Sequence, residues 1–211
     1  MSKLYIAGIG PGSEDFVTPA ARKVVKASEI TIGSKRAVDL FPESREVVLL
    51  NVKDVQEKLE YGVDMVRGGK NVCILSTGDP GFSGVLSPVK RIIEEKGYEG
   101  IELEVVPGIS SLQLCAARVE IPWDDADLMT FHGRENFQEI LPILDNGRPT
   151  ITLPSRSTAD MANFLMDNGI SPDRKVIVCE RLSYPEEKVV EMALKEVAES
   201  EFTYMCVMVI Y

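Results

Sequence analysis

The stretch that most constrains the fold is residues 4–12, LYIAGIGPG, an apolar run that ends abruptly in a glycine loop. Because the run has no polar alternation, it is typical of a parallel strand that is buried on both faces. In a dinucleotide-binding fold the glycine loop opens a helix directly onto a pyrophosphate. Here Pro11 removes one amide donor, and the next helix start, capped by Thr18, lies beyond the acidic pair Glu14 and Asp15. The loop therefore suits an adenosine edge or a zwitterion better than a phosphate, and a plain turn is the alternative.

Strands and helices alternate along the first half of the chain, which predicts a mostly parallel α/β sheet. A break near residues 118–127 divides this half from a second α/β half with a mixed sheet, and no low-complexity linker separates them. We therefore predict two closely packed domains, residues 1–118 and 119–211. In the second half we expect strands at 128–133, 150–153, 175–179 and 202–211, helices at 136–144 and 157–168, and an ambiguous segment at 188–193.

Three of the strands in the first half end in loops that are dense in Gly, Pro and Ser, at residues 8–12, 77–84 and 107–111. In open α/β sheets, ligands bind in the crevice beyond the carboxyl ends of the strands. One such loop indicates only a turn, but three on one sheet indicate a binding site.

Composition excludes several classes of function. The 211 residues include 33 acidic and 23 basic ones, for a formal net charge of −10, which argues against a broad nucleic-acid surface. No apolar run approaches the ~18 residues of a membrane span, and no signal pattern opens the chain, so we expect a cytoplasmic protein. The four cysteines show no Cys-x-x-Cys spacing and indicate buried reduced thiols. With a lone histidine, His132, and no clustered ligands, no metal site is predicted.

Taken together, the loops resemble those of the tetrapyrrole methylase family. The motifs are Gly8-Ile-Gly-Pro-Gly12, Gly78-Asp-Pro80 and Val106-Pro-Gly-Ile-Ser-Ser111, in this order, with a helix start at Thr18 to Ala21. Val17 stands where the family's helix start has leucine. The resemblance covers essentially the whole chain. It implies methyl transfer from S-adenosyl-L-methionine, two α/β domains with the cofactor cleft between them, and a homodimer.

Within the family, the segments His132-Gly-Arg134 and Glu180-Arg-Leu182 are most similar to the corrin-ring enzymes. This implies methylation of C5 of cobalt-precorrin-7, a corrinoid intermediate of cobalamin (vitamin B12) biosynthesis. We expect a stand-alone unit, with a separate decarboxylating methyltransferase acting in the same pathway. The alternatives within the family are another precorrin carbon or diphthine synthase.

The resemblance also implies a set of site residues. Asp79 is expected to anchor the polar end of the cofactor, with a turn role as the alternative. At least one of the arginines past strand ends is expected to pair with a substrate carboxylate, with a solvated surface role as the alternative for each. His132 is expected to accept a proton or orient the substrate, with a structural role as the alternative. The expected cofactor residues are Pro11, Gly78, Asp79, Phe82, Ser110, Ser111, Leu153, Leu182 and Met205, and the expected substrate residues are Arg134, Arg156 and Arg181.

Two interpretations from other classes stay open at this point. A nicotinamide-dependent oxidoreductase would use Glu29, about 20 residues beyond the loop, for a ribose, although Pro11 and the late helix start oppose it. A non-catalytic nucleotide-binding module would hold the same cofactor without turnover. Methyl transfer itself requires no catalytic triad, because the sulfonium methyl is already activated.

Overall fold

The chain folds into two compact units, Met1–Ser110 and Ser111–Tyr211, in a computed structural model that describes residues 2–134, 136–155 and 157–211. The division falls after Ser110, whereas the sequence pattern placed it after Arg118. The difference is one helix, α5 (Ser111–Arg118), whose residues contact strands of the second sheet.

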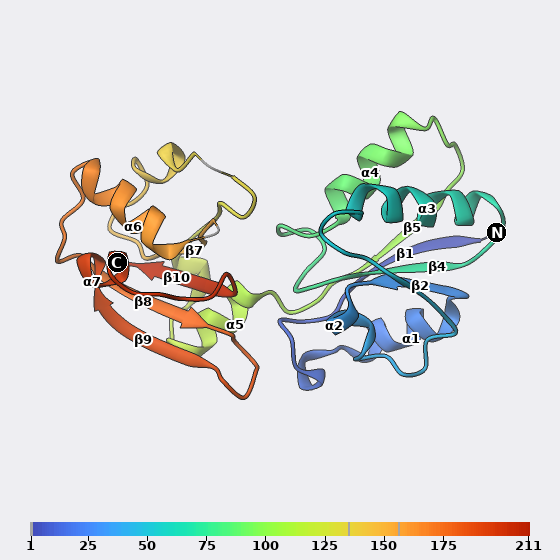
Figure 1. Cartoon of the computed structure of the whole chain (residues 1–211), viewed down its shortest axis with the longest axis horizontal. Helices are drawn as coiled ribbons and strands as arrows, with labels where there is room; N and C mark the ends of the chain where they lie inside the picture. The colour runs from blue at the N-terminus through green and yellow to red at the C-terminus, as the bar shows by residue number, and fades with distance from the viewer. Residues whose placement is uncertain (1, 135, 156) are drawn as a thin grey trace. The chain divides into compact units, whose positions relative to one another are not determined.

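The first unit is a five-stranded sheet in which every neighbouring pair is parallel, in the order β3-β2-β4-β1-β5. Helices α1 and α2 cover one face, and α3 and α4 cover the other (Figure 1). Both faces of the central strands are therefore buried, which explains their unbroken apolar runs. The elements are β1 (Lys3–Gly8), α1 (Pro19–Ala27), β2 (Ile30–Gly33), α2 (Lys35–Val38), β3 (Glu46–Leu49), α3 (Val55–Arg67), β4 (Val72–Ser76), α4 (Leu86–Glu95) and β5 (Glu102–Val106).

The start of α1 is set by local chemistry. The Oγ1 atom of Thr18 accepts a hydrogen bond from the Ala21 amide at 3.1 Å, and Pro19 occupies the first helical position. Both features satisfy or remove amide donors that a helix N-terminus leaves unpaired. The helix therefore begins where the sequence predicts, and the ten residues between β1 and α1 are free to form a loop.

The second unit holds a mixed five-stranded sheet in the order β6-β7-β10-β8-β9, in which only β6 and β7 are parallel among the described pairs. Its core combines residues from α6, α7 and one face of this sheet. Because β10 runs against β7 and β8, its beginning lies at the same edge as the ends of those two strands. The elements are β6 (Asp127–Thr130), β7 (Thr150–Leu153), α6 (Thr158–Asp167), β8 (Lys175–Glu180), β9 (Lys188–Ala193), α7 (Leu194–Ala198) and β10 (Cys206–Ile210).

The helix predicted at 136–144 is wrong. Only one 3-10 turn forms there, Gln138–Ile140, because Pro142 lacks an amide and disfavours helix at the residue before it. The side chain of Asn136 also accepts from the Gln138 amide at 2.9 Å, which offers the backbone a turn instead of a helix.

The closing strand is shorter than predicted, since β10 begins only at Cys206. The Thr203 amide donates to the Glu180 carboxylate at 2.6 Å, so residues just before β10 are held outside the strand ladder. The segment that the sequence left ambiguous, Lys188–Ala193, is a strand paired antiparallel with β8.

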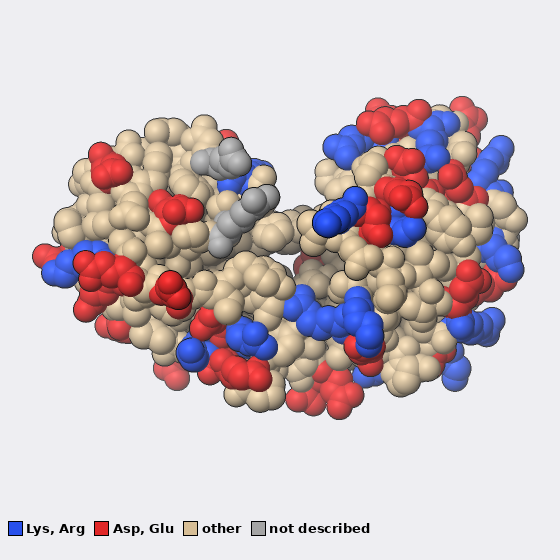
Figure 2. Space-filling view, in the orientation of Figure 1, with Lys and Arg blue, Asp and Glu red and all other residues tan. Residues whose placement is uncertain are grey.

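The structure also shows where the cysteines and the surface charges lie. All four thiols are buried and free, as predicted. On the face shown in Figure 2, acidic and basic side chains are interspersed over both units. Among the helices that the structure describes, none combines the length and apolarity that a bilayer crossing needs.

Candidate functional site

The three glycine loops meet at the carboxyl edge of the first sheet. They follow β4, β1 and β5, which are adjacent strands, so the topology places their ends side by side. The Ile9 amide donates to the Ser76 carbonyl at 3.0 Å, and the Gly78 amide donates to the Gly10 carbonyl at 2.8 Å. A short antiparallel bridge between Gly10 and Gly78 thus joins the first two loops.

Backbone contact between the loops leaves no room for side chains at two glycines. A Cβ atom added to Gly8 would lie 2.4 Å from the Gly108 nitrogen. A Cβ atom added to Gly108 would lie 2.3 Å from the Gly78 carbonyl oxygen. These distances are far below van der Waals contact, so glycine at 8 and 108 is required by the close approach of three backbones.

Asp79 connects the second loop to the third. Its Oδ1 atom accepts from the Gly81 amide at 2.8 Å, which closes the local turn, and its Oδ2 atom accepts from the Gly108 amide at 3.1 Å. The turn role that the sequence offered as the alternative is therefore present. A carboxylate has about four lone-pair sites, so these two bonds leave acceptor capacity, and the cofactor role stays a prediction.

The other predicted residues of this unit lie on the same loops. Pro11 and Gly78 are buried, and Ser110 is 8% exposed at the end of the third loop. Phe82 is half-buried and donates its amide to the Asp79 carbonyl at 3.4 Å. The first unit thus brings together five of the nine predicted cofactor residues.

The second unit brings together three more at one edge of its own sheet. Leu153 ends β7, Leu182 follows β8, and Met205 precedes β10. The Arg181 amide donates to the Met205 carbonyl at 2.9 Å, which joins the last two segments. Leu182 is only 4% exposed. Ser111, the ninth residue, opens α5.

Two predicted residues, His132 and Arg134, lie on the exposed loop after β6. The His132 amide donates to the Thr130 hydroxyl at 3.3 Å, and His132 is exposed. The Phe131 amide donates to the Leu153 carbonyl at 2.8 Å, which places this loop beside the end of β7. Arg134 forms a long ion pair with Glu139, at 3.5 Å, and both side chains are more than half exposed.

Arg181 is more constrained than Arg134. Its guanidinium pairs with Glu186 at 3.2 Å and lies over the Tyr184 ring, 5.5 Å from the centroid. Among the described residues its buried Nε atom has no hydrogen-bond partner. Arg156, the third predicted substrate arginine, lies outside the described residues.

Two carboxylates at this edge, the buried Glu180 and the partly exposed Glu187, were not predicted. Glu180, at the end of β8, accepts from the Thr203 amide and lies 3.6 Å from the Lys188 ammonium. Burial works to raise the pKa of Glu180, but the Thr203 and Lys188 donors outweigh it and hold the pKa below its usual value. Glu187, the residue before β9, accepts from the Ser183 amide at 2.6 Å. A glutamate at the end of a buried strand is the only signal in the sequence that would have suggested the first.

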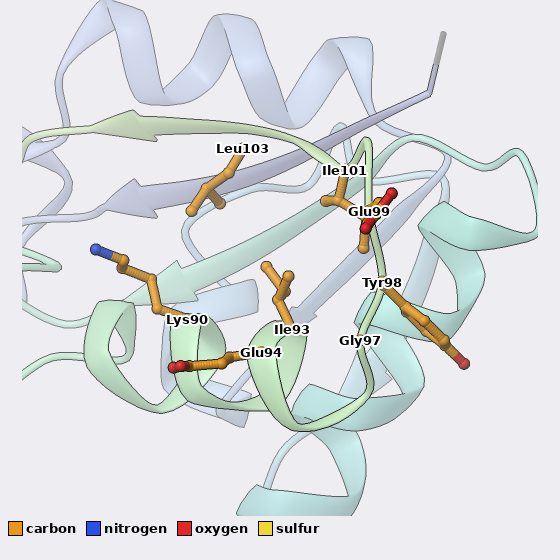
Figure 3. Close-up of a pocket in the computed structure, with 8 residues that line it drawn as sticks. All are labelled: Lys90, Ile93, Glu94, Gly97, Tyr98, Glu99, Ile101 and Leu103. Carbon is orange, nitrogen blue, oxygen red and sulfur yellow. The ribbon is translucent and has the colours of Figure 1, made fainter.

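A separate hollow of about 510 Å³ lies on the first unit, away from the glycine loops (Figure 3). Its lining comes from α4 and from the segment that leads into β5, including Lys90, Ile93, Tyr98 and Ile101. It therefore opens near the amino end of β5, whereas the loops follow the carboxyl ends. The described residues contain no cluster of three or more His, Cys, Asp or Glu side chains arranged to hold a metal ion.

Comparison with known proteins identifies the relatives of this chain. The family model of the Tetrapyrrole (Corrin/Porphyrin) Methylases matches residues 3–198. The chain is 37% identical over 211 residues to a probable cobalt-precorrin-7 C(5)-methyltransferase of Methanocaldococcus jannaschii, covering 98% of this chain and 96% of that protein.

Solved structures share the fold. The methyltransferase CobJ superposes with a TM-score of 0.84 at 20% identity, covering 100% of this chain and 94% of the other. A uroporphyrin-III C-methyl transferase of Thermus thermophilus, complexed with S-adenosyl homocysteine, superposes with a TM-score of 0.78 at 22% identity, covering 99% and 92%.

Proposed function

This chain belongs to the tetrapyrrole (corrin/porphyrin) methylase family and is a methyltransferase, and on that premise we propose that it methylates C5 of cobalt-precorrin-7 in cobalamin biosynthesis. The observation that supports this choice of substrate is the 37% identity to the Methanocaldococcus jannaschii protein, which extends over nearly the full length of both chains. The methyl donor in this proposal is S-adenosyl-L-methionine, the methylated form of the ligand bound in the Thermus thermophilus structure.

The glycine loops support an adenosyl ligand over a dinucleotide. Four of their amides, on Ile9, Gly78, Gly81 and Gly108, already donate to acceptors within the protein. Pro11 has no amide to offer. A pyrophosphate site needs free amides directed at the ligand, and these four amides are already used within the protein. This favours the methyltransferase over the nicotinamide-dependent alternative.

The residues present fit the chemistry that the proposal needs. When bound, S-adenosylmethionine supplies a sulfonium methyl group that is already activated for transfer to a carbon nucleophile. The protein then has to hold donor and acceptor in line and exclude water, for which rigid backbone loops suffice. In this proposal Asp79, which is partly exposed among those loops, meets the cationic end of the cofactor.

The substrate carries many carboxylates, and two arginines at the edge of the second sheet are placed to pair with them. Arg134 and Arg181 now pair with Glu139 and Glu186, whose side chains are 71% and 62% exposed. Exposed ion pairs contribute only about 0–1 kcal/mol, so a substrate carboxylate can replace either glutamate at little cost. His132 lies beside Arg134 on the same loop, and we propose that it orients the substrate.

The homodimer and the cytoplasmic location stay predictions. We propose both on the resemblance to the family, together with the separate decarboxylating methyltransferase in the same pathway. Sedimentation equilibrium of the purified chain tests the first, since a homodimer has twice the mass of the 23.3 kDa chain.

The test of the proposed function is methyl transfer to defined corrinoids. The purified protein is incubated with S-adenosylmethionine that carries a ¹³C methyl group. One reaction also contains cobalt-precorrin-7, and a second reaction contains cobalt-precorrin-4 instead. We expect one added methyl on cobalt-precorrin-7, assigned to C5 by NMR, with equimolar S-adenosylhomocysteine. Transfer only to cobalt-precorrin-4, or to another carbon, would move the protein to a different step, and no transfer to either corrinoid would reject the proposal.

A further inference from the structure

The connection between β8 and β9 contains a strained turn at the edge of the second sheet. Arg181 and Ser183 have φ angles of 51° and 73°, in the left-handed region that non-glycine residues rarely adopt. Between them lies Leu182, whose side chain is buried. A backbone of this kind persists only when surrounding contacts hold it, and such turns are concentrated at functional sites.

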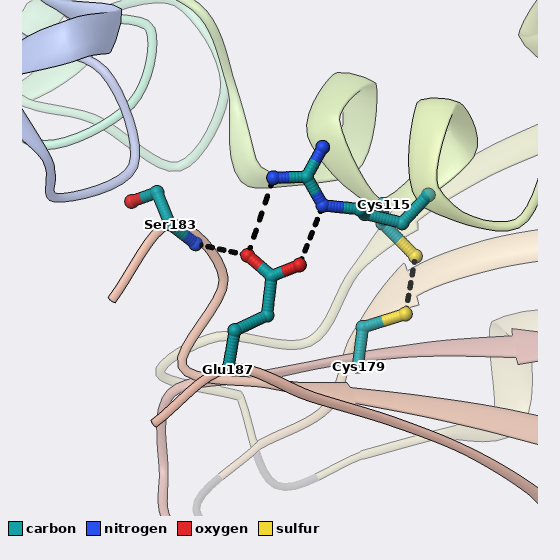
Figure 4. A network of polar contacts seen from close by, with 5 residues as sticks. Cys115, Cys179, Ser183 and Glu187 are labelled. Atoms are coloured by element: carbon teal, nitrogen blue, oxygen red, sulfur yellow. Dashed lines mark hydrogen bonds and ion pairs between the residues drawn. The ribbon is translucent and has the colours of Figure 1, made fainter. Parts of the chain in front are cut away.

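The contact that holds this turn is the carboxylate of Glu187 (Figure 4). Its Oε2 atom accepts from the Ser183 amide at 2.6 Å. The Arg118 guanidinium donates to the same carboxylate from two nitrogens, through Nε to Oε1 at 2.5 Å and through Nη2 to Oε2 at 3.4 Å. One carboxylate therefore joins the strained turn to a residue 69 positions away in the sequence.

The backbone of Arg118 is held in place by the packing of its helix. Arg118 is the last residue of α5, a helix that buries Leu112, Leu114 and Cys115. The Cys115 sulfur lies 3.3 Å from the sulfur of Cys179 on β8 (Figure 4). Cys115 precedes Arg118 by about one turn of α5. Helix α5 is thus packed against β8, the strand that leads into the turn, and this packing fixes the position of the Arg118 backbone.

The charge on Glu187 is preserved in the fold. Burial of this carboxyl, whose side chain is 20% exposed, works to raise its pKa, but the Arg118 guanidinium and the Ser183 amide outweigh it and hold the pKa below its usual value. The contact is therefore a charge-assisted, two-donor arrangement, the stronger kind of hydrogen bond.

We propose that Glu187 is a positioning residue for the cofactor, which holds the turn of Arg181 to Ser183 in its strained conformation by bridging the Ser183 amide to Arg118. The inference rests on the proposed function, because it takes the turn with Leu182 to be part of the S-adenosylmethionine site. Without the bridge the turn relaxes to ordinary backbone, and only a fraction of the molecules stay competent to bind. The apparent affinity falls by that fraction, while the rest of the fold is retained.

The test compares binding of S-adenosylhomocysteine by calorimetry in four proteins. We expect Glu187→Ala to bind about tenfold more weakly than the wild type, because the Ser183 amide loses its acceptor and the link to Arg118 is lost. Glu191→Ala is the matched control, since Glu191 is an exposed carboxylate of β9 that pairs with Lys175, and its affinity should stay within about twofold.

The fourth protein separates positioning from general stability. Adding Ser183→Gly to Glu187→Ala should recover affinity by about threefold or more, because glycine adopts a φ of 73° without strain. A role in stability alone predicts no such recovery. The circular dichroism spectrum of each variant reports whether the fold is retained.

The outcomes are distinct. If the wild type itself does not bind S-adenosylhomocysteine, the proposed function fails. If the wild type binds and a folded Glu187→Ala binds equally well, this inference alone is overturned. Should Glu187→Ala not fold, Arg118→Gln decides by the same measurement, since it keeps the Ser183 bond and should weaken binding about threefold, and unchanged affinity would again overturn the inference.

Discussion

The contact between three backbones at the carboxyl edge of the first sheet gives a sharp prediction for Gly108→Ala. The added Cβ would lie 2.3 Å from the Gly78 oxygen and 2.6 Å from the Gly8 carbonyl carbon. Both are backbone atoms, so neither can swing aside as a flexible side chain would. Overpacking of this kind costs about 1–3 kcal/mol, and displacing the loop also costs the charge-assisted bond from Gly108 to Asp79, about 1.5–3 kcal/mol.

The sum predicts a loss of roughly 2.5–6 kcal/mol in the free energy of unfolding of the first unit. At about 4 °C per kcal/mol for a unit of this size, the melting temperature should fall by roughly 10–24 °C, measured by circular dichroism. Gly68→Ala is the matched control, because its Cβ would meet nothing closer than 3.4 Å and its φ is −76°. That variant should be neutral or slightly stabilised. Equal melting temperatures for the two variants would refute the reasoning from close backbone contact.

Four further predictions follow from single groups. Asp79→Asn should lower the free energy of unfolding by about 1–3 kcal/mol, since one of its two backbone donors then faces an amide NH₂, and chemical denaturation checks this. Burial raises the pKa of the Cys73 and Cys206 thiols to about 12, so iodoacetamide at pH 8 should leave both unmodified in the native protein and alkylate them in guanidinium, as mass spectrometry would show. The lowered pKa of Glu180 stabilises the fold above about pH 4.3, and that contribution is lost as the pH falls through the folded value, so Glu180→Gln should flatten the acid limb of stability in urea titrations at stepped pH. Arg134→Ala should lower kcat/KM about tenfold through KM, with S-adenosylhomocysteine affinity unchanged, and kinetics identical to wild type would assign this arginine to the solvent-exposed surface.

Much of the fold could be predicted because its signals are local. Unbroken apolar runs predicted the parallel strands, and Thr18 with Pro19 fixed the start of α1. The convergence of the three loops also followed, because strands of an α/β sheet end at one edge and each loop is marked by Gly, Pro and Ser. The failure at 136–144 is instructive: a helix was predicted there, but Pro142 and the Asn136 turn determined the backbone conformation.

What the sequence could not provide is the set of contacts between distant segments. Nothing in the pattern pairs Arg118 with Glu187, since 69 residues separate them. Left-handed backbone at Arg181 and Ser183 has no signal either, because neither residue type favours that region. Sequence reasoning therefore predicted a site at the edge of the second sheet and did not predict Glu180 and Glu187, the carboxylates that hold the backbone there.

Two arginine–glutamate pairs, Arg181 with Glu186 and Arg118 with Glu187, bear on how we propose that a protein of net charge −10 binds a polycarboxylate. In the pair of Arg181 with Glu186, the Glu186 side chain is 62% exposed. The pair of Arg118 with Glu187 is different, because Glu187 is 20% exposed and also holds the Ser183 amide. Removing the Glu186 carboxylate costs little free energy, because the pair is exposed. Removing the Glu187 carboxylate leaves both the Arg118 guanidinium and the Ser183 amide without their acceptor. We therefore propose that a substrate carboxylate exchanges with Glu186 and not with Glu187, so that binding depends on local exchange at Arg181 rather than on net charge.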